Sequence, residues 1–162
     1  MAGRLGLVHL SSDIVQKQLA GLNPKEEARD AFGEGLYQPA MTRRMYNALT
    51  HRARQWLRRG HSVVLDATYG RLKERAAIRR LARRVGARLV PFVWRAPDNV
   101  LRHRLASCQN QPAGVSDARL ELWPQPRAAF AEPTELSEVF TISSARPPNK
   151  AVAQAAAVLT GT

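Results

Sequence analysis

The run Val63-Val64-Leu65-Asp66-Ala67-Thr68 constrains the fold most strongly, because a short apolar stretch here ends in a carboxylate. An apolar run of this length is typical of a strand buried in a parallel sheet. Helical spacing of apolar residues on both sides of the run supports the same arrangement, because alternating strands and helices favour a parallel sheet. Ligands of such sheets bind at the carboxyl ends of the strands. The sequence therefore places Asp66 at a candidate phosphate site.

The rest of the chain continues this alternation of strand and helix. Ser11, Ser12 and Asp13 stand between a short apolar run and a helical pattern, which predicts a second strand that ends near Asp13. No internal repeat or linker interrupts the chain, so we expect one α/β domain over residues 1–162, with a parallel sheet and helices on both faces. The expected strands are 5–10, 61–66, 87–94 and 139–142; the expected helices begin near 12, 41, 72, 96, 116 and 150.

Length and composition bear on the number of domains and on the cellular location of the protein. At 162 residues and 18.0 kDa the chain fits a single hydrophobic core. No apolar run approaches the roughly 18 to 20 residues that a membrane span requires, and the start has no apolar block of signal-peptide length. Cys108 is the only cysteine, so no disulfide forms within the chain. We expect a cytoplasmic protein that does not use a membrane as a partner.

The net charge of +12 makes nucleic acid one of the partners to consider, because a basic protein attracts polyanions. The basic residues are spread over several predicted helices, without interleaved aromatic residues or a recognisable nucleic-acid module. That distribution favours an ordinary solvated surface. Arginine far outnumbers lysine, which agrees with phosphate recognition and equally with a genome rich in arginine codons. Charge alone leaves both interpretations open.

Asp66 and Asp13 are the candidate catalytic residues. A carboxylate at the end of a buried strand is costly unless it meets a cation or hydrogen-bond donors, and in phosphoryl-transfer sites that cation is Mg²⁺, bound directly or through water. Asp66 would hold or orient this metal. Asp13 would accept the proton of an attacking hydroxyl group. The alternative for each residue is simple capping of the following helix, and for Asp13 the spacing alone favours that alternative.

Arginines beyond the third expected strand could bind nucleotide phosphates, where developing negative charge needs donors. Arg102 and Arg104 precede a polar loop at 109–114, but their spacing sets them about 200° apart on a helix, so at most one faces the site. The alternative is an exposed basic face. The histidines show no metal-ligand spacing, so we assign no structural metal. The Gly-x-Ser-x-Gly motif of many hydrolases is also absent from the sequence.

Taken together, the ordered motifs resemble the predicted P-loop kinases of the AAA-domain type, which are related to the polynucleotide kinase and gluconate kinase branches. The resemblance runs from about Leu5 to Ile142. It implies transfer of the ATP γ-phosphate to a hydroxyl group with Mg²⁺ as cofactor. It matches Asp13 to the substrate-activating Asp, Asp66 to the Walker B-like acid and Arg104 to a lid arginine. The segments that carry it are 10–17, 32–37, 63–68, 95–97 and 115–118.

The chain departs from the resembled family at the phosphate-binding loop. That family has a central strand and a Gly-x-x-x-x-Gly-Lys-Ser/Thr loop before the Ser-Ser-Asp segment, and residues 1–10 supply neither. Gln16 and Cys108 stand where the family commonly has arginines. We therefore expect a chain truncated at its N-terminus and weak or absent ATP binding. The sheet would lack its central strand between the strands at 62–66 and 88–94. These two strands could then pair directly, or another chain or an upstream segment could fill the gap.

Two functions follow as hypotheses. The first is an ATP-dependent phosphotransferase, inactive or weak in this form, whose acceptor is a small-molecule hydroxyl group or a polynucleotide end. The second is a non-catalytic basic protein that binds nucleic acid or a protein partner. The sequence leaves the acceptor and the oligomeric state undetermined.

Overall fold

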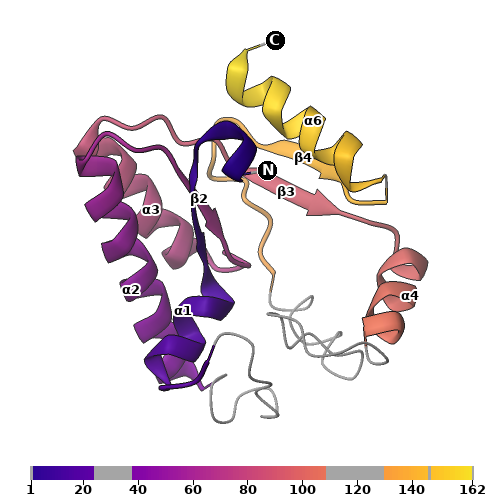
Figure 1. Ribbon diagram of the computed structural model, residues 1–162, viewed down its shortest axis with the longest axis horizontal. Helices are drawn as coiled ribbons and strands as arrows, with labels where there is room; N and C mark the ends of the chain where they lie inside the picture. The colour runs from indigo at the N-terminus through magenta and orange to yellow at the C-terminus, as the bar shows by residue number, and fades with distance from the viewer. Residues whose placement is uncertain (1, 24–37, 109–129, 146, 162) are drawn as a thin grey trace.

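The computed structural model describes residues 2–23, 38–108, 130–145 and 147–161 (Figure 1). Several sequence predictions lie outside these residues: the segments 32–37 and 115–118 of the family resemblance, the polar loop at 109–114 and the helix expected to begin near 116. Within the described helices, none is long and apolar enough to cross a membrane. The helices are α1 (Ser12–Leu19), α2 (Pro39–Arg58), α3 (Leu72–Val85), α4 (Asp98–Cys108) and α6 (Pro148–Thr160), with a 3-10 turn η1 at Ala2–Leu5.

Four short strands pair in two parallel sheets. They are β1 (Val8–Ser11), β2 (Val63–Asp66), β3 (Phe92–Arg95) and β4 (Phe140–Ser143). β1 pairs with β2, and β3 pairs with β4, both in parallel. In the described part of the chain, β2 and β3 thus belong to different sheets, so the direct pairing of these two strands that the sequence left open is not observed. The α/β class with parallel strands is confirmed, but the single sheet is present as two separate pairs.

All four described strands begin later than the sequence predicted, and the two longest delays, those of β1 and β3, have local causes. Residues 2–5 form η1, and Gly6 follows in the left-handed region at φ +64°, so β1 begins at Val8 and not at Leu5. β3 begins at Phe92 and not at Ala87. Pro91 has no N–H to donate to a ladder, although its carbonyl accepts a hydrogen bond of 3.0 Å from the N–H of Phe140.

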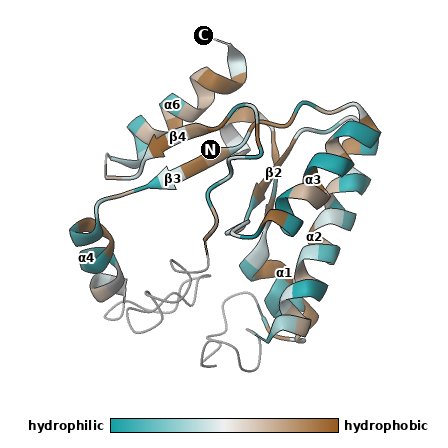
Figure 2. Cartoon of the chain, turned by 180° about the vertical axis from the view of Figure 1, so that it is seen from behind, coloured by the Kyte–Doolittle hydropathy of each residue, from teal (hydrophilic) through white to brown (hydrophobic). Residues whose placement is uncertain are grey.

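Each sheet pair has a small hydrophobic core of its own. Leu10 of β1 and Leu65 of β2 pack against Val15 of α1 and against α2, where Leu49 is fully buried. On the other pair, α6 packs on β4, where Ile142 is fully buried against two small residues, Ala151 and Ala155. Figure 2 shows hydrophobic colouring on the strands and hydrophilic colouring over much of α2 and α3. The outer surfaces of α2 and α3 are therefore polar.

The segment that leads into β4 joins the two pairs. We call residues 130–137 the connector. The N–H of Ala131 donates to the carbonyl of Gly70, beyond the end of β2, at 2.9 Å. Arg75 of α3 donates to both carboxylate oxygens of Glu135, and Arg95 at the end of β3 pairs with Glu132. The connector therefore contacts elements of both pairs.

Candidate functional site

The two candidate carboxylates lie at the carboxyl edge of the β1–β2 pair. Asp66 is the last residue of β2, and the register places it beside Ser11, the last residue of β1. Asp13 follows two residues later, in the first turn of α1. The side chain of Asp66 is 68% exposed, and Asp13 is half-buried. Both carboxylates therefore occupy the edge at which parallel sheets bind ligands.

Neither carboxylate is the capping residue of its helix. The N-cap of α1 is Ser11, so Asp13 lies inside the first turn, where the helix dipole favours a negative charge. The N-cap of α3 is Arg71, whose N–H donates to the carboxylate of Glu74 at 3.3 Å. Asp66 lies five residues before that cap. Simple N-capping, the alternative open for both residues in the sequence, therefore does not account for either position.

His9 is a member of this site that the sequence analysis did not single out. Its ring Nε2 lies 3.2 Å from Oδ2 of Asp66, and 46% of the His9 side chain is exposed. The register explains the contact, because His9 pairs with Val64 and both therefore share a sheet face with Asp66. A sequence signal does exist: in parallel strands, residues two apart lie on the same face. The sequence does not show which strands pair, so this signal alone could not bring His9 and Asp66 together.

A tyrosine of α2 holds the turn that follows Asp66. The Tyr46 hydroxyl lies 3.0 Å from Oγ1 of Thr68 and accepts a hydrogen bond from the N–H of Tyr69 at 3.1 Å. Tyr69 adopts φ +43°, an uncommon value for a non-glycine residue, and its ring packs 5.3 Å from the Tyr46 ring. Burial raises the pKa of Tyr46 and of Tyr69, so both phenols stay protonated near neutral pH. The turn carrying Thr68 is thereby fixed to the core.

The predicted arginines lie at the other sheet pair. Arg104 of α4 donates to the carbonyl of Ser144, just beyond the end of β4, and Arg102 is exposed on the same helix. The N–H of Ser144 in turn donates to the carbonyl of Arg95 at the end of β3. Arg104 thus lies at the carboxyl ends of β3 and β4, whereas the two aspartates lie at those of β1 and β2. The contact described for Arg104 does not join it to either carboxylate.

The side chains at the candidate site can bind Mg²⁺ but do not supply a complete set of ligands for it. Among the described residues, no three side chains of His, Cys, Asp and Glu gather closely enough to hold a metal ion. Mg²⁺ keeps several waters and is usually bound by one or two carboxylates together with substrate phosphates. The exposed carboxylate of Asp66 fits that mode, and His9 would orient it. Residues of the candidate site thus suit a metal that arrives with a phosphate ligand.

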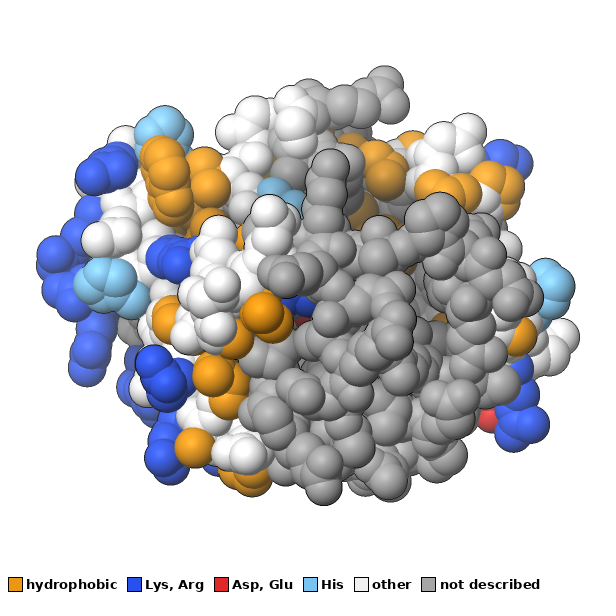
Figure 3. Space-filling view, turned by 60° about the horizontal axis from the view of Figure 1, so that its bottom comes forward, with side chains coloured by type: hydrophobic (Ala, Val, Ile, Leu, Met, Phe, Trp, Pro, Cys, Tyr) orange, Lys and Arg blue, Asp and Glu red, His pale blue; other side chains and the backbone are white. Residues whose placement is uncertain are grey.

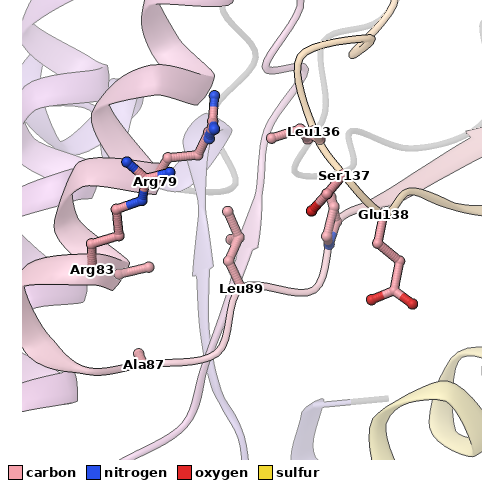
Figure 4. A pocket seen from close by; sticks show the side chains of 9 residues that line it. Arg79, Arg83, Ala87, Leu89, Leu136, Ser137 and Glu138 are labelled. Carbon is pink, nitrogen blue, oxygen red and sulfur yellow. The ribbon is translucent and has the colours of Figure 1, made fainter.

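A cavity of about 250 Å³ lies at the opposite edge of the fold (Figure 4). Leu89 and Leu136 line it from the segments that precede β3 and β4, and Arg79 and Arg83 line it from α3. The cavity is therefore at the amino ends of these strands. We do not assign it to the candidate site, because ligands of parallel sheets bind at the carboxyl ends.

Comparison with known proteins identifies the family and the fold of this chain. The AAA domain family matches residues 1–133 of the 162-residue chain, so the chain belongs to this family. A crystal structure of a gluconokinase from Sinorhizobium meliloti 1021 superimposes with a TM-score of 0.67 at 15% identity, over 98% of this chain and 80% of the gluconokinase. At that identity the match establishes the fold, which is that of a P-loop kinase.

Particular relatives are found in mycobacteria. Uncharacterized proteins of Mycobacterium tuberculosis H37Rv and Mycobacterium bovis are each 30% identical to this chain over 155 residues, which is 96% of this chain. The chain spans only 30% of the length of these relatives. The similarity therefore concerns one part of each larger protein.

Proposed function

We propose that this domain is a phosphotransferase that passes the ATP γ-phosphate to a hydroxyl group. The acceptor belongs to a small molecule or to a polynucleotide end. The observation that carries the proposal is the placement of Asp13 and Asp66 at adjacent strand ends, where neither serves as a helix cap. Membership of a nucleotide-binding family and the kinase fold support it.

In the proposed reaction, Asp13 accepts the proton of the acceptor hydroxyl as that oxygen attacks the γ-phosphorus. The bond from this phosphorus to the bridging oxygen breaks, and ADP leaves. Asp66, oriented by His9, would hold Mg²⁺ directly or through water. The metal supplies neutralisation of the phosphate charge when it is bound. Arg104, or Arg102 on the same helix, would bind the nucleotide phosphates.

Nucleotide affinity is expected to be low for the chain as printed. A phosphate loop binds through backbone amides and a lysine that follows a glycine. The sequence contains no Gly-Lys pair, so it has no Walker A motif. We propose that Mg²⁺·ATP binds weakly to this chain and that turnover needs millimolar ATP.

Phosphate transfer from γ-labelled ATP at millimolar concentration tests the proposal, with sugars, nucleosides and 5′-hydroxyl oligonucleotides as acceptors. Asp13→Asn should lower kcat by about 10² to 10⁴, the range for loss of a general base. Asp98→Asn is the matched control, because Asp98 also lies in the first turn of a helix. An Asp13→Asn protein that transfers phosphate as fast as the control, or a wild-type protein that labels none of these acceptors, would contradict it.

A further inference from the structure

Nearly all of the net charge of the protein is carried by two helices. α2 and α3 hold eleven of the 25 basic residues and one of the 13 acidic residues, so they account for +10 of the net +12. A general preference for arginine in the genome would spread the excess over the whole chain. The remainder of the chain is instead close to neutral. The excess positive charge is therefore concentrated on α2 and α3.

Most of the basic side chains of α2 and α3 point away from the core. α2 buries Met45, Leu49 and Ala53, and α3 buries Ile78 and Leu81, so the opposite side of each helix faces solvent. Eight cations of these helices are exposed: Arg43, Arg44, Arg54, Arg58, Lys73, Arg80, Arg83 and Arg84. We call this set the basic face. In Figure 3, most of the Lys and Arg side chains in view gather along the side formed by α2 and α3.

The basic face has no acidic residue to offset it within its two helices. Glu74 is their single carboxylate; it is 9% exposed and accepts the N–H of Arg71. Arg75 is buried and bound to Glu135, so it does not belong to the face. Within these helices the exposed cations are thus uncompensated. Like charges crowded on neighbouring helices repel one another, and a bound polyanion would remove that repulsion.

We propose that the basic face binds the phosphate backbone of double-stranded nucleic acid, independently of sequence. The proposal does not depend on the phosphotransferase activity. Arg44 and Arg58 are separated by about 21 Å along α2 at 1.5 Å per residue. A duplex carries one charge per roughly 1.7 Å with both strands counted, so that length carries about twelve phosphates, of which only those on the side toward the protein can contact it. Guanidinium groups suit this ligand because they donate to phosphate oxygens in pairs.

The basic face lacks the features that bind single-stranded nucleic acid or a lipid surface. Single strands are held by stacking their bases on aromatic side chains. The aromatic residues of α2 and α3 are Tyr46, which is buried, and Trp56, whose ring contacts His61 and Arg59. A helix on a lipid surface buries an apolar face among the acyl chains. Here the apolar faces of both helices are used in the protein core. Duplex nucleic acid, bound only through its backbone, is the occupant that fits.

Fluorescence anisotropy with a labelled 20-base-pair DNA duplex, titrated between 50 and 300 mM NaCl, tests this inference. If about five phosphates are neutralised, log K should fall with log salt with a slope of about −4 to −5. Arg84→Gln should weaken binding about fivefold to tenfold at 0.1 M salt and reduce the slope by about one. Combining Arg44→Gln, Arg58→Gln, Arg80→Gln and Arg84→Gln should weaken binding a thousandfold or more.

Lys150→Gln is the matched control, because it changes the net charge equally at an exposed position of α6, away from the basic face. It should leave the slope unchanged. Thermal melting followed by circular dichroism should show that all variants remain folded, since exposed substitutions change stability by about 0.5 kcal/mol or less. Equal losses in Lys150→Gln and Arg84→Gln would overturn the inference. So would no duplex binding at 50 mM salt, or tighter binding to a dT20 single strand or to phosphatidylserine vesicles.

Discussion

Replacement of Arg75 by methionine tests how the connector is held, because Arg75 donates four hydrogen bonds to it. Its guanidinium makes five hydrogen bonds, two to Glu135 and three to backbone carbonyls. The carbonyls are those of Tyr69, Ala131 and Glu132. The Arg75 side chain is 8% exposed and that of Glu135 is 20% exposed. Methionine preserves most of the apolar stem but removes every donor.

The expected loss of stability is about 3 kcal/mol. Removing one partner of a buried ion pair typically costs about 3–5 kcal/mol. The lower end applies here, because Glu135 retains some exposure and can recover hydrogen bonds from water. A domain of this size is stable by about 5–15 kcal/mol, so the variant should remain folded at 25 °C but with a much smaller margin.

Urea unfolding followed by tryptophan fluorescence measures the effect. At a slope of about 2 kcal/mol per molar urea, the midpoint should fall by about 1.5 M. Arg80→Met is the control, because Arg80 is exposed on the same helix and should shift the midpoint little. Equal midpoints for the two variants would refute the argument that Arg75 fixes the connector. A double-mutant cycle that combines Arg75→Met with Glu135→Gln separates the stability contributed by the ion pair from that contributed by the carbonyl contacts.

Three further predictions concern stability. The hydrogen bonds from Arg75 lower the pKa of Glu135 below its ordinary 4.5, so the ionised carboxylate stabilises the folded state. This stabilisation is complete above about pH 4.5 and is lost as the pH falls through the folded pKa. Glu135→Gln should therefore make the urea midpoint depend less on pH between pH 5 and 3. Tyr46→Phe leaves the N–H of Tyr69 without its acceptor and should cost about 1–2 kcal/mol in the same assay. Gly86→Ala should cost about 1 kcal/mol by thermal melting, purely from its φ of +67°, since no atom lies within 4 Å of an added Cβ.

Local signals in the sequence identified most elements of the fold. The helix expected from Leu72 ends at Val85 with Gly86 in the left-handed conformation, as its position after the amphipathic pattern indicated. β2 ends at Asp66 as predicted. The errors fell where two local rules compete. Apolar residues from Leu5 and from Ala87 favour strands, but a 3-10 turn in one case and Pro91 in the other delay pairing.

The candidate site was predictable only in part, because its contacts differ in their separation along the chain. Asp66 ends β2 and Asp13 comes two residues after the end of β1, so strand prediction sufficed to place them at the carboxyl edge. The contact of His9 with Asp66 spans 57 residues, and that of Arg75 with Glu135 spans 60. Such pairs depend on strand register and helix packing, which no local pattern encodes. The excess of basic residues in 39–58 and 72–85 can be counted in the sequence, but only the structure shows that α2 and α3 lie side by side (Figure 1).

The position of the connector relates the stability argument to the proposed chemistry. In a continuous sheet, ladder hydrogen bonds between neighbouring strands would fix the carboxyl ends relative to one another. In the described part of this chain β2 and β3 share no ladder, and the connector contacts both pairs through Arg75, Arg95 and the N–H of Ala131. The aspartates belong to one pair and Arg104 to the other. The connector therefore helps to set the distance between the proposed acid–base groups and the proposed phosphate-binding arginine, and Arg75→Met should affect both stability and phosphate transfer.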